Sequence, residues 1–258
     1  MSQNLWTKEQ AIIALDLYCK VPFNKATNSN PDIQRVANLI GRSVTSVKMK
    51  IGNFGNFDPE LKKRGIVGLS NISKLDEEVW NEYFNHWDKL AYDAQILISK
   101  YENKAIEDVA QIEDSIKNLP EGKEKLVIVK QRINQAFFRN AVLASYSSTC
   151  CITGLKNPKL LEACHIADWS KDTENRTNPS NGLCMNSLMH KAYDNFLISV
   201  SPDYEILVSD KFLESEKENH IISDMLSQIN HRKINLPTRF FPEKRFLDFH
   251  HQKFLEAN

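Results

Sequence analysis

The first third of the chain shows apolar residues at helical spacing, interrupted by short polar stretches. Residues 5–18 carry apolar side chains three and four positions apart, which predicts an amphipathic helix. Asn4 or Thr7 can cap its beginning, and it should end before Pro22. A polar loop follows, and a second helical pattern starts at Pro31.

Two short helices around a glycine turn are expected next. Pro31 suits the first turn of one helix, Gly41 can end it, and Ser43 can cap the following one. Their buried faces should consist of Ile33, Val36, Ala37 and Ile40 in the first helix and of Val44, Val47 and Ile51 in the second. This is a helix-turn-helix layout, whose second helix can enter the major groove of DNA. The side chains expected to point outward and bind DNA are Arg42, Ser43, Thr45, Ser46, Lys48 and Lys50.

Charge is unevenly distributed along a chain of 258 residues whose formal net charge is zero. Residues 1–74 contain 11 basic and 5 acidic side chains, whereas residues 75–121 contain 4 basic and 12 acidic ones. A basic module beside an acidic spacer is typical of nucleic-acid binding, although a solvated surface without a partner gives the same pattern. The basic segment 61–73 would make the first module winged if it is extended. One or two acidic helices should follow.

The remainder indicates a mixed α+β domain. A helix is expected at 129–144, then a short strand around His165, a turn-rich loop, another helix and a hairpin at 197–209. Pro120 and Gly122 break the acidic pattern before these elements. We therefore predict a DNA-binding domain at 1–100, an acidic helical linker at 101–124 and a second domain at 125–258.

Three polar features of this second domain lie at short distances along the sequence. His165 lies in the expected strand, and Asn181 follows across one loop. His190 and Asp194 are four residues apart in an expected helix, so both side chains leave the same face and can meet one cation. A single histidine and aspartate at this spacing often occur by chance. The ordered set of His165, Asn181, His190 and Asp194 is far more specific.

At these residues the sequence resembles the HNH, or ββα-metal, endonuclease family. The matching pieces within about residues 130–210 are "CITG", "LEACHI", "NGL", "HKAYD" and "LISV". The closing segment 234–254 is similar to the tail of one prokaryotic branch of the family. The N-terminal third looks like the helical DNA-binding modules that restriction enzymes fuse to such nucleases.

The resemblance implies a hairpin packed on a helix with a metal between them. It assigns His165 as the general base, Asn181 as the asparagine of the catalytic set that braces the loop, His190 as a metal ligand and Asp194 as a further ligand. Histidine suits proton removal near neutral pH, and a divalent cation, here expected to be Mg²⁺ or Mn²⁺, offsets charge on the phosphate. The expected products carry a 5′ phosphate and a 3′ hydroxyl.

One position departs from the family. Many members place a metal-binding acidic residue or histidine directly before the general base, where this chain has Cys164. A thiolate is a poor ligand for Mg²⁺, so Cys164 could serve packing alone and Glu162 could supply the carboxylate. The five cysteines contain no C-x-x-C pair, which argues against a disulfide framework and against structural zinc.

We therefore expect a metal-dependent endonuclease of duplex DNA, a restriction enzyme whose dependence on modified cytosine stays open. One such site cuts one strand, so a double-strand break needs a homodimer or two encounters. The rivals are a DNA-binding regulator with an inactive HNH fold and an enzyme acting on RNA or single strands. No apolar run approaches the roughly 18 residues of a membrane span, and no targeting segment is evident, which favours a cytoplasmic protein.

Overall fold

The computed structural model of the protein describes residues 5–66, 72–168 and 172–258. The chain divides into two compact units, residues 1–144 and 145–258. Within the described residues, no helix is both long and apolar enough to cross a membrane.

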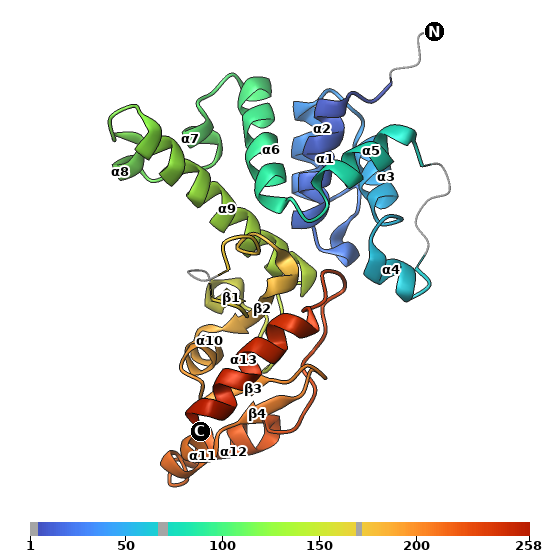
Figure 1. The fold of residues 1–258 in the computed structure, drawn as a ribbon. Coiled ribbons are helices and arrows are strands. Elements are labelled where there is room, and N and C mark those ends of the chain that lie inside the picture. The colour runs from blue at the N-terminus through green and yellow to red at the C-terminus, as the bar shows by residue number, and fades with distance from the viewer. Residues whose placement is uncertain (1–4, 67–71, 169–171) are drawn as a thin grey trace. The chain divides into compact units, whose positions relative to one another are not determined.

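The first unit is helical throughout its described part (Figure 1). Its α-helices are α1 (Lys8–Lys20), α2 (Pro31–Leu39), α3 (Val44–Phe54), α4 (Pro59–Lys63), α5 (Lys74–Tyr83), α6 (Trp87–Glu102), α7 (Ile106–Val109), α8 (Asp114–Lys117) and α9 (Lys123–Ser145).

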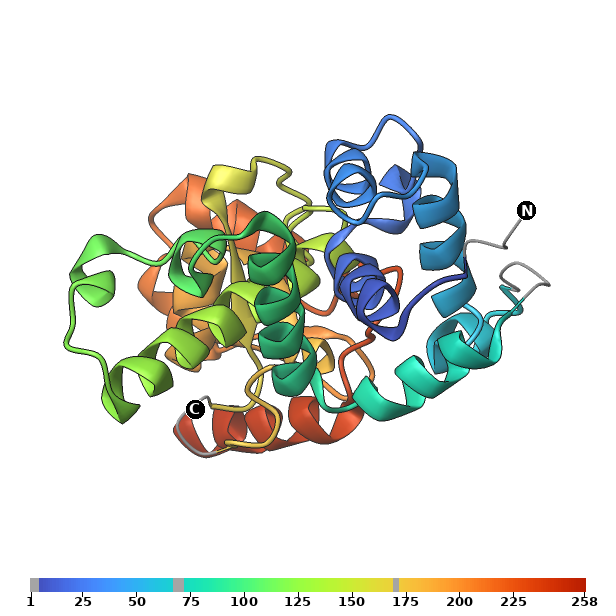
Figure 2. The ribbon, with the colours of Figure 1, turned by 90° about the horizontal axis from the view of Figure 1, so that it is seen from above.

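Helix α1 is the centre of this unit, and α2, α3, α5 and α6 pack around it (Figures 1 and 2). Thr7 and Gln10 form a reciprocal capping box at its beginning, which confirms one of the two expected caps. Residues 11–19 are all buried, so α1 is enclosed on every side rather than on one face.

The α2–α3 pair forms as expected. Asn30 caps α2, Gly41 adopts a φ of +65° that favours glycine, and the Ser43 side chain accepts a hydrogen bond from Ser46 N at the start of α3. Val47 and Ile51 are buried as expected, whereas Val44 is only partly buried.

The expectation that Lys50 points outward is wrong. Its side chain is 5% exposed and forms an ion pair with Asp76, which is completely buried at the beginning of α5. Asp76 also accepts a hydrogen bond from Asn53 Nδ2 at 3.0 Å, and Lys50 Nζ lies 4.7 Å from the centroid of the Trp6 ring. Lys50 therefore stabilises the first unit from inside.

The acidic segment forms four helices, α5 to α8, where one or two were expected. The aromatic residues Trp80, Phe84 and Trp87 form a cluster, with centroid distances of 5.2 Å between Trp80 and Phe84 and 5.6 Å between Phe84 and Trp87. They do so across the turn between α5 and α6, where Asn85 has a φ of 65°. The expected wing at 61–73 begins instead with helical residues of α4, and its residues 67–71 lie outside the described residues.

The second unit contains two small antiparallel sheets and several helices. The first sheet pairs β1 (Leu161–His165) with β2 (Gly182–Asn186), and the second pairs β3 (Ile198–Val200) with β4 (Ile206–Val208). Its helices are α10 (Ser187–Asp194), α11 (Asp210–Ser215), α12 (His220–Ile229) and α13 (Lys244–Ala257). Helix α10 contacts β1, β2 and β3, and α13 packs on β3 (Figure 1). The expected mixed α+β organisation is therefore present.

The division between the units lies after the predicted start of the second domain at residue 125. Helix α9 explains the difference, because its contacts with α6 make it part of the first unit. The Phe137 ring stacks on Trp87 with centroids 6.4 Å apart, and Lys130 Nζ lies 3.6 Å from a carboxylate oxygen of Asp88. The functional limits of the two domains and of the linker at 101–124 stay a prediction.

Candidate active site

Strand β1 presents two polar side chains towards helix α10. In the antiparallel pairing Glu162 lies opposite Met185 and Cys164 opposite Leu183. Side chains two apart on a strand share a face, so Glu162 and Cys164 point the same way. Both reach residues of α10, as the contacts below show, so the strand supplies two of the side chains around that helix.

Helix α10 supplies the histidine and the aspartate. The Asn186 side chain caps it by accepting a hydrogen bond from Met189 N at 2.9 Å. One turn further on, His190 Nε2 lies 3.5 Å from an Asp194 carboxylate oxygen. The predicted common face of these two residues is therefore present.

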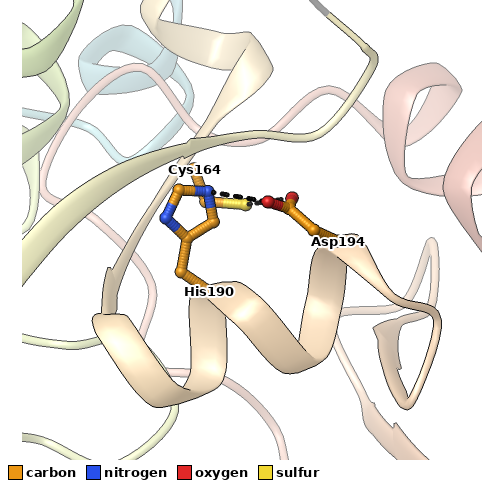
Figure 3. Close-up of side chains that lie close together, drawn as sticks. All are labelled: Cys164, His190 and Asp194. Atoms are coloured by element: carbon orange, nitrogen blue, oxygen red, sulfur yellow. Dashed lines mark hydrogen bonds and ion pairs between the residues drawn. The ribbon is translucent and has the colours of Figure 1, made fainter.

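Cys164 completes a group of three ligand atoms (Figure 3). Its sulfur lies 4.0 Å from Asp194 Oδ1, and the ligand atoms of Cys164, His190 and Asp194 all lie within 4.8 Å of one another. Within the described part of the chain, this is the one group of three or more such residues so close together. The sulfur is fully buried, whereas the His190 and Asp194 side chains are 24% and 51% exposed.

The spacing of these atoms fits a single first-row metal ion. Four-coordinate sites with bond lengths of about 2.0 to 2.3 Å separate neighbouring ligand atoms by roughly 3.4 Å. The two contacts of Asp194, at 3.5 and 4.0 Å, are close to that separation. Burial raises the pKa of the Cys164 thiol well above its ordinary value, with the nearby Asp194 charge adding to the effect. Without a cation the thiol is therefore protonated.

Glu162 lies on the other side of the histidine ring. Its carboxylate accepts hydrogen bonds from His190 Nδ1 and, at 2.8 Å, from Ser187 Oγ. It is not a member of the three-residue group. A carboxylate on one ring nitrogen fixes the tautomer and orientation of a histidine whose other nitrogen can bind a metal. Glu162 therefore orients His190 in this structure.

His165 ends β1 next to this group. Its Nε2 lies 2.9 Å from the carbonyl oxygen of Arg176, which can only accept, so Nε2 carries the hydrogen. In the neutral ring the basic lone pair is then on Nδ1. Burial lowers the pKa of the His165 imidazole below its ordinary value, which keeps the ring neutral at pH 7. A neutral imidazole is the form that can accept a proton.

Asn181 braces the backbone that follows His165. Its side-chain oxygen accepts a hydrogen bond from Ala167 N at 2.8 Å, and its amide donates to the carbonyls of Ala167 and Asn175, each at 3.3 Å. The backbone oxygen of Asn181 also accepts from Ile166 N. The residue is completely buried, so it positions the loop rather than touching a substrate.

A comparison with protein families shows which family this part of the chain is similar to. Residues 150–201 match the family model described as HNH endonuclease. Residues 150–201 are thus similar to HNH endonucleases, and we call them the HNH domain. The match contains Cys164, His165, Asn181, His190 and Asp194, and it covers the two strands of the first sheet and helix α10. A comparison with curated proteins finds no match for the chain. An HNH endonuclease domain indicates nuclease activity on DNA.

A pocket of about 480 Å³ opens beside His165, His190 and Asp194 of the HNH domain. Residues of β1, the loop after it, α10 and α13 line it: Ala163, His165, Ile166, Asp168, His190, Asp194, Phe196, Phe249, His250 and Lys253. The sequence did not single out Asp168, Phe196, Phe249 or Lys253. The last two are more than 50 residues away from His190 along the chain, and only the packing of α13 brings them to the pocket.

The remaining cysteines of the second unit are buried thiols away from this group. Cys150 Sγ accepts hydrogen bonds from the backbone N–H groups of Thr153 and Asn186, each at 3.4 Å. Burial raises the pKa of the Cys151 thiol well above its ordinary value. These contacts show how the turn at the start of the HNH domain is attached to the end of β2.

The expected DNA-binding residues of the first unit fall into two sets: residues held by contacts within the unit, and residues on the surface of α3. Arg42 donates hydrogen bonds to Gln10 Oε1 and to the carbonyl of Leu5, and its guanidinium lies 4.9 Å from the Trp6 ring centroid, so it holds the segment before α1. Lys50 is buried and Ser43 caps α3. Three of the six expected residues therefore remain on the surface of α3. Thr45 and Lys48 are exposed, and Ser46 is partly exposed.

Proposed function

We propose that this chain is a metal-dependent endonuclease that hydrolyses phosphodiester bonds of duplex DNA. The observation that carries the proposal is the convergence of His165, which is neutral and partly buried, with His190 and Asp194 on one pocket, next to the buried sulfur of Cys164. Proton transfer and charge neutralisation are the two requirements of phosphodiester hydrolysis, and this pocket offers a group for each.

In the proposed reaction, His165 Nδ1 removes a proton from a water molecule as its oxygen attacks phosphorus. The bond from phosphorus to the 3′ oxygen breaks, and the departing oxygen takes a proton from solvent. This leaves a 5′ phosphate and a 3′ hydroxyl. The hydrogen bond from Nε2 to Arg176 O keeps the ring oriented, and Asn181 holds the adjacent loop. Together they keep the base in position before substrate binds.

A divalent cation would be held by His190 and Asp194, with Cys164 as the third protein ligand, and would offset negative charge on the phosphate and on the departing oxygen. This ligand set differs from the expected one, in which Glu162 could bind the metal. A thiolate is a soft ligand, so the set favours Mn²⁺ or a softer first-row ion over Mg²⁺. Glu162 then acts by orienting His190.

We further propose that the first unit binds duplex DNA through the exposed face of α3, with Thr45, Ser46 and Lys48 as its contacts. Lys48 would contribute a phosphate contact, and the two hydroxyls can reach phosphates or bases. The biological role that fits a DNA-binding unit joined to a nuclease is restriction of invading DNA. Cutting both strands would then require a homodimer or two successive encounters.

The regulator with an inactive HNH fold is the second candidate, and the buried, protonated Cys164 is the observation that favours it. If this thiol does not bind a metal, two protein ligands remain. Cleavage assays separate the two functions. Three preparations of one long DNA, with ordinary, 5-methyl or 5-hydroxymethyl cytosine, would be incubated with the protein and Mg²⁺, Mn²⁺ or a chelator. An RNA copy and a single-stranded copy would test the remaining rival.

The proposal predicts cutting of at least one duplex that requires a cation and stops in chelator. The preferred cytosine form would decide whether the enzyme depends on modification. Tight duplex binding without cutting under any cation would support the regulator. Faster cutting of RNA or of single strands than of every duplex would contradict the proposed substrate.

A further inference from the structure

Helix α13 forms a wall of the active-site pocket, although it lies outside the part of the chain that matches the HNH family. The match ends at residue 201, and α13 begins at Lys244. Phe249, His250 and Lys253 of this helix all line the pocket together with His165, His190 and Asp194. A substrate entering the pocket therefore meets side chains that the family match does not assign.

Lys253 is held over an aromatic ring at this wall. Phe249 and Lys253 are four residues apart on α13 and so share a face. The Lys253 ammonium lies 4.0 Å from the centroid of the Phe249 ring, and the lysine is partly buried. A cation–π contact at an exposed ring is a weak attraction, so Phe249 favours this position of the Lys253 ammonium without fixing it.

His250, which also lines the pocket, adds no positive charge to this wall. The neighbouring His250 has a pKa of about 4, mainly because it is buried, and the Lys253 charge contributes to lowering it. Nδ1 of this histidine accepts a hydrogen bond from Ser199 Oγ at 2.9 Å, and Nε2 donates to the carbonyl of Tyr193 at 3.1 Å. His250 is thus neutral and structural, and Lys253 is the charged group on this wall.

A positive charge on this wall would favour the entry of a phosphodiester, in addition to the divalent cation proposed at His190 and Asp194. Its lining includes two carboxylates, Asp168 and Asp194, which repel a phosphate. Among the lining residues that the structure describes, Lys253 is the only one with a permanent positive charge. Lysine is a common phosphate-binding residue because its ammonium acts as a compact point charge.

We propose that Lys253 binds a non-bridging phosphate oxygen of the DNA strand in the pocket, with Phe249 positioning its ammonium group. This inference rests on the proposed endonuclease function. It deepens that function by assigning substrate binding to a helix beyond the matched domain. The contact forms when the strand binds and persists through the reaction, so it contributes to affinity more than to the chemical step.

A binding experiment in chelator tests the contact without cleavage. The affinity of the full chain for a fluorescent 30-base-pair duplex would be measured over a series of salt concentrations. The variants are Lys253→Gln, which keeps most of the stem over Phe249, and Lys253→Arg, which keeps the charge. The matched control is Lys244→Gln, because Lys244 is an exposed lysine on the same helix that pairs with Asp203 and does not line the pocket.

We expect Lys253→Gln to raise Kd about tenfold and to lower the salt slope by about one, as the loss of one charge-assisted phosphate contact should. Lys253→Arg should bind within about threefold of the unaltered protein. Lys244→Gln should match the unaltered protein. Equal Kd values and salt slopes for Lys253→Gln and Lys244→Gln would overturn the proposal.

Cleavage kinetics with a divalent cation give a second readout. Lys253→Gln should raise KM about tenfold with kcat within about twofold, the pattern of a lost binding contact. A large fall in kcat with unchanged Kd would also overturn the proposal, because Lys253 would then act in the chemical step. If the unaltered protein binds duplex but does not cut it, the nuclease function fails, and the binding experiment still decides the contact. If it does not bind duplex at all, both fail.

Discussion

The HNH domain and helix α3 of the first unit were both expected to act on DNA, and the structure arranges their predicted residues differently. In the HNH domain, His165, His190 and Asp194 lie on one pocket. On α3 and the turn before it, Lys50 is buried in an ion pair and Arg42 is bound to Gln10 and Leu5. Only part of the expected DNA-binding surface is therefore available.

The difference follows from how each expectation was built. The HNH residues were identified as an ordered set in which strand, loop and helix each had a defined place. The residues of α3 were selected because they are polar and basic on a short amphipathic helix. A lysine at such a position can equally well extend to solvent or pair with a buried carboxylate, and a helical pattern does not distinguish these outcomes.

The largest effect should come from removing a residue of the ligand group. His190→Ala should lower the rate of cation-dependent DNA cleavage about a thousandfold, because charge stabilisation worth several kcal/mol is lost. The matched control is Lys191→Ala, an exposed neighbour on the same helix that does not line the pocket. Initial rates at saturating Mn²⁺ would measure both. A rate for His190→Ala within tenfold of the control would refute the assignment.

The next largest effect should be on the stability of the first unit. Asp76→Ala leaves the Lys50 ammonium buried without its carboxylate, which should destabilise the unit by about 3 to 5 kcal/mol. Lys50→Met, with Asp76→Ala in the same chain, should recover part of that loss. Urea unfolding followed by tryptophan fluorescence would measure it, because three of the four tryptophans, Trp6, Trp80 and Trp87, belong to this unit. A stable Asp76→Ala variant would show that Lys50 can reach solvent after all.

A smaller effect should show whether Glu162 orients His190 or binds the cation itself. Glu162→Gln should weaken cation binding about 10- to 100-fold, because His190 loses the carboxylate that orients it. Higher cation concentration should then restore most of the cleavage rate. A loss of cleavage that no concentration of Mn²⁺ restores would argue that Glu162 has a direct part in the reaction.

The smallest effect should be on the surface of α3. Lys48→Ala should weaken duplex binding several-fold, equally for all sequences, and lower the salt slope by about one. Lys50→Met combined with Asp76→Ala should not change the salt slope, since both side chains are buried. Fluorescence anisotropy of a labelled duplex over a salt series would compare the two. Equal slopes for Lys48→Ala and the unaltered protein would remove α3 from the DNA-binding surface.

The sequence predicted the elements of the site better than the contacts between its side chains. The strand ending at His165, the helix bearing His190 and Asp194, and the hairpin after it all follow from local pattern. Spacing could not decide between Cys164 and Glu162, because both lie on the same face of β1 and the choice depends on which ring nitrogen each one approaches. The contribution of α13 to the pocket could not be predicted from the sequence, because it depends on packing between segments far apart in the chain.

The central claim is that His165 is the general base of a metal-dependent nuclease site, and cleavage by His165→Ala tests it most directly. The variant and the unaltered protein would be compared on one duplex at saturating Mn²⁺, with Kd for the same duplex measured in chelator. The account predicts a kcat lower by about 10² to 10⁴ and a Kd within about twofold. Cleavage by His165→Ala at the unaltered rate would contradict it.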